Sequence, residues 1–121
     1  MKRTILIIED NEQNRYLATY LLERHGYAVV TAPDGPQGIA TARTLVPDLI
    51  LLDIQLPVMD GYEVARGLRN IQPLHGIPIV AVTSYAMVGD CEKCLAAGCN
   101  GYIEKPINPE TFAGEIETFL T

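Results

Sequence analysis

The sequence predicts an α/β domain with a doubly wound parallel sheet, and two patterns lead to that class. First, apolar runs typical of buried strands alternate with amphipathic helical segments five times along the 121 residues, which indicates parallel strands joined by helices. Second, the strand runs are apolar on both pleat faces, as a sheet covered by helices on both sides requires. The length and the 48% hydrophobic content fit a single domain with a substantial core.

The first two strands and helices are predicted from their boundary signals. An apolar strand at residues 4–8 precedes a helix that ends at Gly26, because glycine readily takes the left-handed conformation of a helix terminus. The apolar stripe of that helix consists of Leu17, Ala18, Leu21 and Leu22. A second strand covers residues 27–31, and Asp34 caps a second helix that runs to about Leu45.

The middle of the chain continues the alternation. Pro47 separates the second helix from a central strand at residues 48–52, which ends at Asp53. A third helix follows the Asp60-Gly61 turn and runs to about Asn70. Its inward-facing residues are Val64, Ala65 and Leu68.

The last elements complete the pattern. A fourth strand covers residues 77–82, a fourth helix covers roughly residues 87–97, and a fifth strand covers residues 101–104. Asn108 caps the last helix and Pro109 occupies its first position, where a missing N–H is harmless. The residues expected to face the sheet are Phe112, Ile116 and Phe119 or Leu120.

Charge and composition exclude several classes of function. The net charge is −6 and the pI is about 4.7, so the chain lacks the basic footprint of a protein that binds nucleic acid directly. No apolar run approaches the roughly 18 residues of a membrane span, and the start does not read as a secretory signal. The odd cysteine count, from Cys91, Cys94 and Cys99, favours the reducing cytoplasm.

Four predicted strands end in polar side chains that parallel topology brings to one sheet edge, where ligands of such sheets bind. These side chains are Glu9, Asp10, Asp53, Thr83 and Lys105. The three carboxylates give −3 and the lysine gives +1. Two carboxylates about 4 Å apart repel by roughly 4 kcal/mol at an effective dielectric of 20, so a pKa rises or a cation binds.

The composition of this edge indicates phosphoryl chemistry. Hard oxygen ligands without histidine or cysteine suit Mg²⁺ or Mn²⁺. A carboxylate can form an aspartyl phosphate, and Asp53 is the candidate because it ends the central strand between the acid pair and Thr83. Lys105 would then pair the phosphoryl oxygens, and the Thr83 hydroxyl would donate to another of them.

Four segments around these residues resemble the receiver domain of two-component response regulators, and the resemblance covers essentially the whole chain. The segments are Glu9–Glu12, Asp48–Gly61, Val82–Met87 and Tyr102–Pro106. The run from Ala86 to Asp90, together with Lys105-Pro106-Ile107, resembles the receivers of hybrid sensor kinases and of stand-alone regulators of the DivK kind.

The resemblance implies a flavodoxin-like (βα)5 domain over residues 1–121, with five parallel strands in the order 2-1-3-4-5, helices on both faces and no output domain. It implies that Asp53 is the phosphoacceptor and that Thr83 and Lys105 contact the phosphate. The implied metal ligands are Glu9, Asp10, Asp53 and the backbone carbonyl of Gln55. A cis bond between Lys105 and Pro106 is also expected, as family members show.

The resemblance further implies a switch and a set of partners. Tyr102 turns inward as Thr83 moves to the phosphate, which alters the surface of the fourth helix, fifth strand and fifth helix. Gln55 and Tyr85 occupy positions that modulate the dephosphorylation rate. The expected partners are a histidine kinase or histidine phosphotransfer protein and a downstream effector, with a monomer or a phosphorylation-dependent dimer as the active form.

The same residues argue against other classes of function. The chain is expected to catalyse only its own phosphorylation and dephosphorylation, as a complete single-domain regulator or as one domain of a larger protein. A haloacid-dehalogenase-like phosphatase needs a second aspartate where Gln55 stands. A flavin or nucleotide site would be repelled by the acidic segment Glu9–Glu12, and a docking module without phosphorylation would not need the complete set of polar residues.

Overall fold

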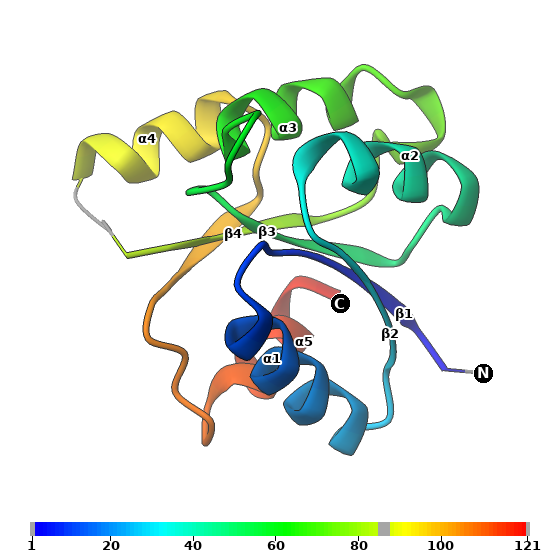
Figure 1. Ribbon diagram of the computed structural model, residues 1–121, viewed down its shortest axis with the longest axis vertical. Helices are drawn as coiled ribbons and strands as arrows, with labels where there is room; N and C mark the ends of the chain where they lie inside the picture. The colour runs from blue at the N-terminus through cyan, green and yellow to red at the C-terminus, as the bar shows by residue number, and fades with distance from the viewer. Residues whose placement is uncertain (1, 85–87, 121) are drawn as a thin grey trace.

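The computed structural model describes residues 2–84 and 88–120 and shows one five-stranded parallel sheet between two layers of helices (Figure 1). The strand order is β2-β1-β3-β4-β5, which confirms the predicted class and order. The strands are β1 (Thr4–Ile8), β2 (Ala28–Ala32), β3 (Leu49–Asp53), β4 (Ile79–Thr83) and β5 (Gly101–Glu104). The helices are α1 (Glu12–Arg24), α2 (Gly35–Leu45), α3 (Gly61–Arg69), α4 (Val88–Ala96) and α5 (Phe112–Leu120), with a 3₁₀ turn η1 (Gln72–Leu74).

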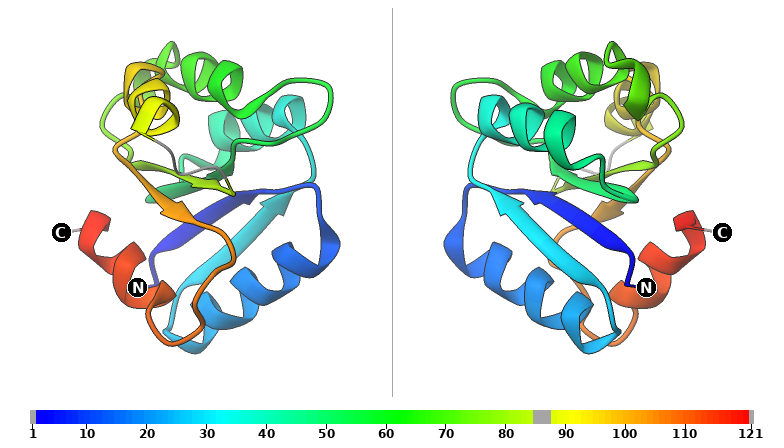
Figure 2. Two further views of the ribbon diagram at one scale, coloured as in Figure 1. Left: turned by 90° about the vertical axis from the view of Figure 1, so that its left-hand side faces the viewer. Right: turned by 90° about the vertical axis from the view of Figure 1, so that its right-hand side faces the viewer.

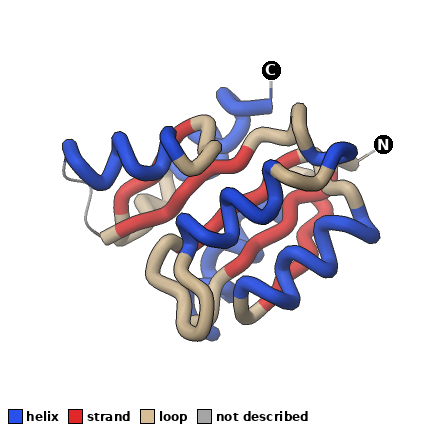
Figure 3. The backbone as a smooth tube through the Cα atoms, turned by 90° about the horizontal axis from the view of Figure 1, so that it is seen from above, coloured by secondary structure: helices blue, strands red, loops and turns tan. Residues whose placement is uncertain are grey.

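The helices divide between the two faces of the sheet. Helices α2, α3 and α4 cover one face, and α1 and α5 cover the other, as the views from both sides and from above show (Figures 2 and 3). Each face has its own apolar core. No helix within residues 2–84 and 88–120 is long and apolar enough to cross a membrane.

Strand β1 shows why its apolar run has no polar alternation. Leu6 and Ile8 lie in the core under α2, α3 and α4, whereas Ile5 and Ile7 lie in the core under α1 and α5. All four side chains are almost fully buried. Because successive residues of a strand point to opposite faces, a strand buried on both sides must be apolar at every position.

Capping side chains begin three of the helices. The side-chain oxygens of Asn11, Asp34 and Asp60 accept hydrogen bonds from the backbone N–H three residues on, at 2.9, 2.9 and 3.0 Å. Each cap satisfies a backbone donor that the first helical turn leaves free. The predicted cap at Asp34 and the predicted end of that helix at Leu45 are confirmed.

Element boundaries differ from the predictions by one to three residues. Strand β2 is shifted one residue along the chain, and Asp53 is the last residue of β3 rather than the residue after it. Helix α5 begins at Phe112 instead of Pro109, because residues 109–111 form a turn. The Asn108 side chain still accepts a bond from the N–H of Glu110, at 3.0 Å. Met87, the predicted start of the fourth helix, lies outside the described residues.

Gly61 allows α3 to begin directly against the end of β3. A Cβ atom at this position would collide with the backbone of Ile54 and lie 2.7 Å from the carbonyl oxygen of Asp53. The N–H of Gly61 donates to the Ile54 carbonyl at 2.9 Å. A glycine is therefore required here, and it keeps the loop after Asp53 close to the sheet.

We expect Val46→Gly to stabilise the protein by about 0.5–1 kcal/mol. Val46 ends α2 with a φ of 49°, which is unfavourable for a β-branched residue, and its side chain is 42% exposed, so little burial is lost. Urea unfolding monitored by circular dichroism measures the change. Val46→Ala is the control, since it removes the side chain but keeps the strained backbone; an equal gain in both variants would contradict the explanation.

Candidate functional site

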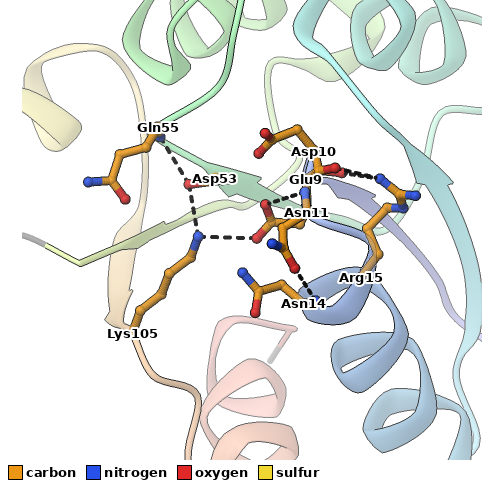
Figure 4. Close-up of polar contacts among 8 residues, drawn as sticks. All are labelled: Glu9, Asp10, Asn11, Asn14, Arg15, Asp53, Gln55 and Lys105. Carbon is orange, nitrogen blue, oxygen red and sulfur yellow. Dashed lines mark hydrogen bonds and ion pairs between the residues drawn. The ribbon is translucent and has the colours of Figure 1, made fainter.

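Three carboxylates gather at the carboxyl edge of the sheet, where β1 and β3 end side by side (Figure 4). Glu9 and Asp53 are buried, with 6% and 3% of their surface exposed, whereas Asp10 is exposed. One oxygen from each of the three residues lies within 4.8 Å of the others. The structure thus brings together the acid residues that strand-end topology predicted.

Lys105, the residue after β5, completes the cluster. Its Nζ atom lies 3.2 Å from Glu9 Oε1 and 3.3 Å from Asp53 Oδ1, so one ammonium bridges two carboxylates from different strands. Its backbone N–H donates to the carbonyl of Thr83 at 2.8 Å, which ties it to the end of β4. The peptide bond from Lys105 to Pro106 is cis, as expected.

Backbone donors orient the two buried carboxylates. The N–H of Gln55 donates to Asp53 Oδ1 at 2.9 Å, and the N–H of Asn11 donates to Glu9 Oε2 at 3.2 Å. Each carboxylate is therefore held both by its neighbouring turn and by Lys105 (Figure 4). Such contacts reduce the reorganisation needed when a ligand arrives.

Burial and neighbouring charges shift the pKa values of Glu9 and Lys105. Burial raises the pKa of Glu9 to about 7, and a hydrogen bond with Asp53 and the charge of that residue act in the same direction. For Lys105, burial alone lowers the pKa, but the attraction of the Asp53 and Glu9 carboxylates outweighs it, so the pKa is raised. The lysine is therefore charged at neutral pH, while Glu9 sits near its titration midpoint.

The donor set fits a hard divalent cation. It consists of carboxylate oxygens from Glu9, Asp10 and Asp53, close enough to share one ion. Mg²⁺ and Mn²⁺ prefer such ligands and keep several waters, for which the exposed side of Asp10 leaves room.

Thr83 and Tyr102 lie on the face of the sheet that α2, α3 and α4 cover. In β4, Val80 and Val82 belong to the core under α1 and α5, so Thr83 alternates to the face covered by α4, as does Ala81. Ala81 is the register partner of Tyr102 in the neighbouring strand. Thr83 is 3% exposed and Tyr102 is 43% exposed.

The Tyr102 ring meets α4 through Cys91. Side-chain interaction with Cys91 is the main cause that raises the pKa of Tyr102, followed by repulsion from the negative charge of a Cys91 thiolate. Tyr102 is therefore partly exposed to solvent on the α4 side of the sheet. Of the two residues expected to modulate dephosphorylation, Gln55 is exposed beside Asp53, and Tyr85 lies outside the described residues.

One residue of the site was missed by the sequence analysis. The Nη1 atom of Arg15 donates to the backbone carbonyls of Glu9 and Asp10, at 3.0 and 3.1 Å. A single arginine on a helix resembles an ordinary surface residue. Its position was nevertheless a signal, because a cation near a helix N-terminus opposes the helix dipole and needs a compensating partner.

Comparison with known proteins gives a consistent match. Residues 5–117 match the family model of the response regulator receiver domain. The polar-differentiation response regulator DivK of Brucella ovis is 42% identical over 120 residues, which cover 99% of this chain and 98% of that protein.

Two solved structures extend the similarity to the fold. The receiver domain of sensor histidine kinase PA1611 from Pseudomonas aeruginosa, which has a magnesium ion coordinated in its active site cleft, is 35% identical with a TM-score of 0.91. The alignment covers 99% of this chain and 98% of that one. Chemotaxis protein CheY4 of Vibrio cholerae is 29% identical with a TM-score of 0.95, over 99% and 100% of the two chains.

Glu9 should make the metal-free protein less stable as the pH rises from 4.5 to about 7. The folded state binds the Glu9 proton more tightly than the unfolded state does. The resulting stabilisation is fully present below the pKa of Glu9 in the unfolded state, and it is lost as the pH rises through the pKa in the folded state. The loss is at most about 1.4 kcal/mol per pH unit. Urea unfolding in EDTA at several pH values measures it.

Glu9→Gln should flatten this pH dependence, because the amide cannot titrate. Glu12→Gln provides the matched control, since Glu12 is exposed on the same turn. A pH profile that is equally steep in wild type and in Glu9→Gln would contradict the assignment.

Proposed function

The chain belongs to the response regulator receiver family of two-component signalling, and from that premise we propose that Asp53 accepts a phosphoryl group from a phosphohistidine. Such a domain is a signalling protein rather than a classical enzyme. The observation that carries the proposal is the buried Asp53 carboxylate, held beside two further carboxylates and bridged to Glu9 by Lys105. We take residues 1–121 to act as one receiver unit.

The proposed reaction is an in-line displacement at phosphorus. A carboxylate oxygen of Asp53 attacks, a new P–O bond forms, and the P–N bond to the donor imidazole breaks, so that the imidazole leaves with the electron pair and takes up a proton. Lys105 stabilises the negative charge on the transferring oxygens. Dephosphorylation is attack by water on the same phosphorus, and we propose that Gln55 and Tyr85 modulate its rate.

We further propose that Mg²⁺ or Mn²⁺ is held by Glu9, Asp10, Asp53 and the backbone carbonyl of Gln55. When bound, the ion neutralises charge on the phosphoryl oxygens. The side chains of the three acids and Lys105 sum to −2, which one divalent cation balances. The magnesium ion in the related PA1611 receiver supports this choice.

Thr83 is proposed to transmit the phosphorylation of Asp53 to the face of the sheet that α4 covers. Thr83 follows Val82, the register partner of Asp53, and its carbonyl already accepts from Lys105. Its hydroxyl would donate to the phosphoryl group and vacate space on the α4 side. Ala81, the register partner of Tyr102, carries only a methyl group, and we propose that the Tyr102 ring turns inward over it.

The proposed partners follow from this chemistry. A histidine kinase or histidine phosphotransfer protein supplies the phosphoryl group, and a downstream effector reads the surface of α4, β5 and α5, either on a monomer or on a phosphorylation-dependent dimer. Neither nucleic acid nor a membrane is proposed as a direct partner. The cytoplasm is the proposed compartment, because the odd number of cysteines in the sequence favours a reducing environment.

Incubation with a small acyl phosphate and Mg²⁺ should add the mass of one phosphoryl group to the intact protein. Asp53→Asn should show no gain, because the amide is not nucleophilic, and EDTA should prevent the gain in wild type. Intact mass spectrometry measures both. An equal gain in Asp53→Asn would refute the proposed acceptor, and steady turnover of an aryl phosphate would instead indicate a hydrolase.

Phosphorylation should bury Tyr102, and Thr83→Ala should prevent this without preventing phosphorylation. The reason is that alanine lacks the hydroxyl proposed to move toward the phosphoryl group, whereas Thr83→Ser keeps it and should retain the response. Hydroxyl-radical footprinting of the Tyr102 ring measures the change, with Tyr16, 73% exposed on α1, as the internal control. Burial of Tyr102 to the same extent in Thr83→Ala would rule out the coupling.

A further inference from the structure

The three carboxylates of the site are held in place in different ways. Asp53 and Glu9 each have a side-chain oxygen bonded to a backbone N–H and another contact to Lys105. Asp10 is exposed, and none of the hydrogen bonds or ion pairs recorded within residues 2–84 and 88–120 reaches its carboxylate. The direction in which this carboxylate points therefore depends on the backbone that carries it.

Arg15 holds that backbone. Its Nη1 atom donates to the Asp10 carbonyl at 3.1 Å and to the Glu9 carbonyl at 3.0 Å, so one nitrogen clamps two successive peptide groups. The arginine is half-buried on α1 and lies on the side of the acid pair away from Lys105 (Figure 4). The backbone N–H of Arg15 also donates to the Asn11 carbonyl at 2.9 Å, which fixes the start of α1 against the same turn.

We propose that Arg15 is a positioning residue for the divalent cation, which acts by holding the turn from Glu9 to Asp10 so that the Asp10 carboxylate faces the other two. The inference rests on the proposed function, because it concerns the cation of the same site. The two cations of the site thus have different roles. Lys105 binds carboxylate oxygens, whereas Arg15 binds carbonyl oxygens and leaves all three carboxylates available.

The sign of the effect separates positioning from simple charge. The guanidinium is a positive charge bonded to the backbone of the two residues that carry the Glu9 and Asp10 carboxylates. The Debye length is about 8 Å at physiological ionic strength, so salt does not fully screen charges on neighbouring residues. By charge alone it repels Mg²⁺, so its removal would strengthen metal binding. Loss of positioning has the opposite effect, because Asp10 must then be ordered at the moment of binding.

Calorimetric titration of the purified protein with MgCl₂ tests the proposal. Arg15→Gln should weaken Mg²⁺ binding by about 10-fold, the lower range for loss of a group that orients a metal ligand. Arg15→Lys, which keeps the charge and one donor group, should fall between that variant and wild type. Arg24→Gln is the matched control: it removes the same charge from the same helix, where Arg24 bonds only the Tyr20 side chain among the described residues, and should bind like wild type.

Equal or tighter binding by Arg15→Gln would overturn the proposal. If Arg15→Gln does not fold, Arg15→Lys is used in its place. An Mg²⁺ affinity equal to wild type together with a lower melting temperature would then overturn the proposal, because it would show that Arg15 contributes only to stability. A wild type that does not bind Mg²⁺ would instead overturn the proposed function.

A double-mutant cycle identifies the ligand through which Arg15 acts. Asp10→Asn weakens binding by removing a charged ligand, and the addition of Arg15→Gln should then weaken it little further, because the oriented group is already lost. Independent, multiplicative losses would show that Arg15 does not act through Asp10. The metal-free protein gives a second readout, since the Asn11 N–H that bonds Glu9 should exchange its hydrogen faster in Arg15→Gln; unchanged exchange would count against a held turn.

Discussion

Two carboxylates buried against each other, those of Glu9 and Asp53, are the constraint on which the rest of this structure depends. Two such groups repel strongly once water is removed, and burial without a partner is more costly still. The fold meets this with one bridging ammonium, two backbone N–H donors and a Glu9 pKa raised to about 7. Negative charge still exceeds positive charge, so the site gains by taking up a proton or a divalent cation. The proposed capacity to bind a cation would therefore result from an arrangement that is unfavourable without one.

The pleat of the sheet places the proposed phosphoryl site and the proposed switch residues on opposite faces. Asp53 continues the side of β3 that faces α1 and α5, as do Leu49 and Leu51, whereas Thr83 alternates to the α4 side of β4. Tyr102 lies on that same side, next to Ala81. Val82, the register partner of Asp53 at the proposed phosphoryl site, is thus only one residue along β4 from Thr83 on the other face of the sheet. No long chain of contacts is needed, because adjacent residues of a single strand already face opposite layers.

The sequence predicted the features that depend on local patterns and failed for those that depend on side-chain direction. Residue types alone indicate strands buried on both faces and the Asp34 cap, so the fold class and the meeting of the strand-end acids with Lys105 could be predicted, whereas the strand order was predicted from the family resemblance. The start of α5 was wrong by three residues, because a proline after a capping asparagine fits a turn as well as a helix. Arg15 was missed because its partners are carbonyl groups, which every residue possesses.

Lys105 must exchange its carboxylate contacts for contacts to the phosphoryl group during the proposed reaction. It now bridges Glu9 and Asp53, but a phosphoryl group on Asp53 would carry more charge than either carboxylate and attract the ammonium away from them. Glu9 would then lose its ion pair and depend on the metal, which explains why a second acid is useful there. The backbone N–H of Lys105 donates to the Thr83 carbonyl at 2.8 Å. The lysine proposed to move to the phosphoryl group is therefore already bonded to the threonine proposed to transmit the change. A displacement of either therefore acts directly on the other, at the point where β4 and β5 end.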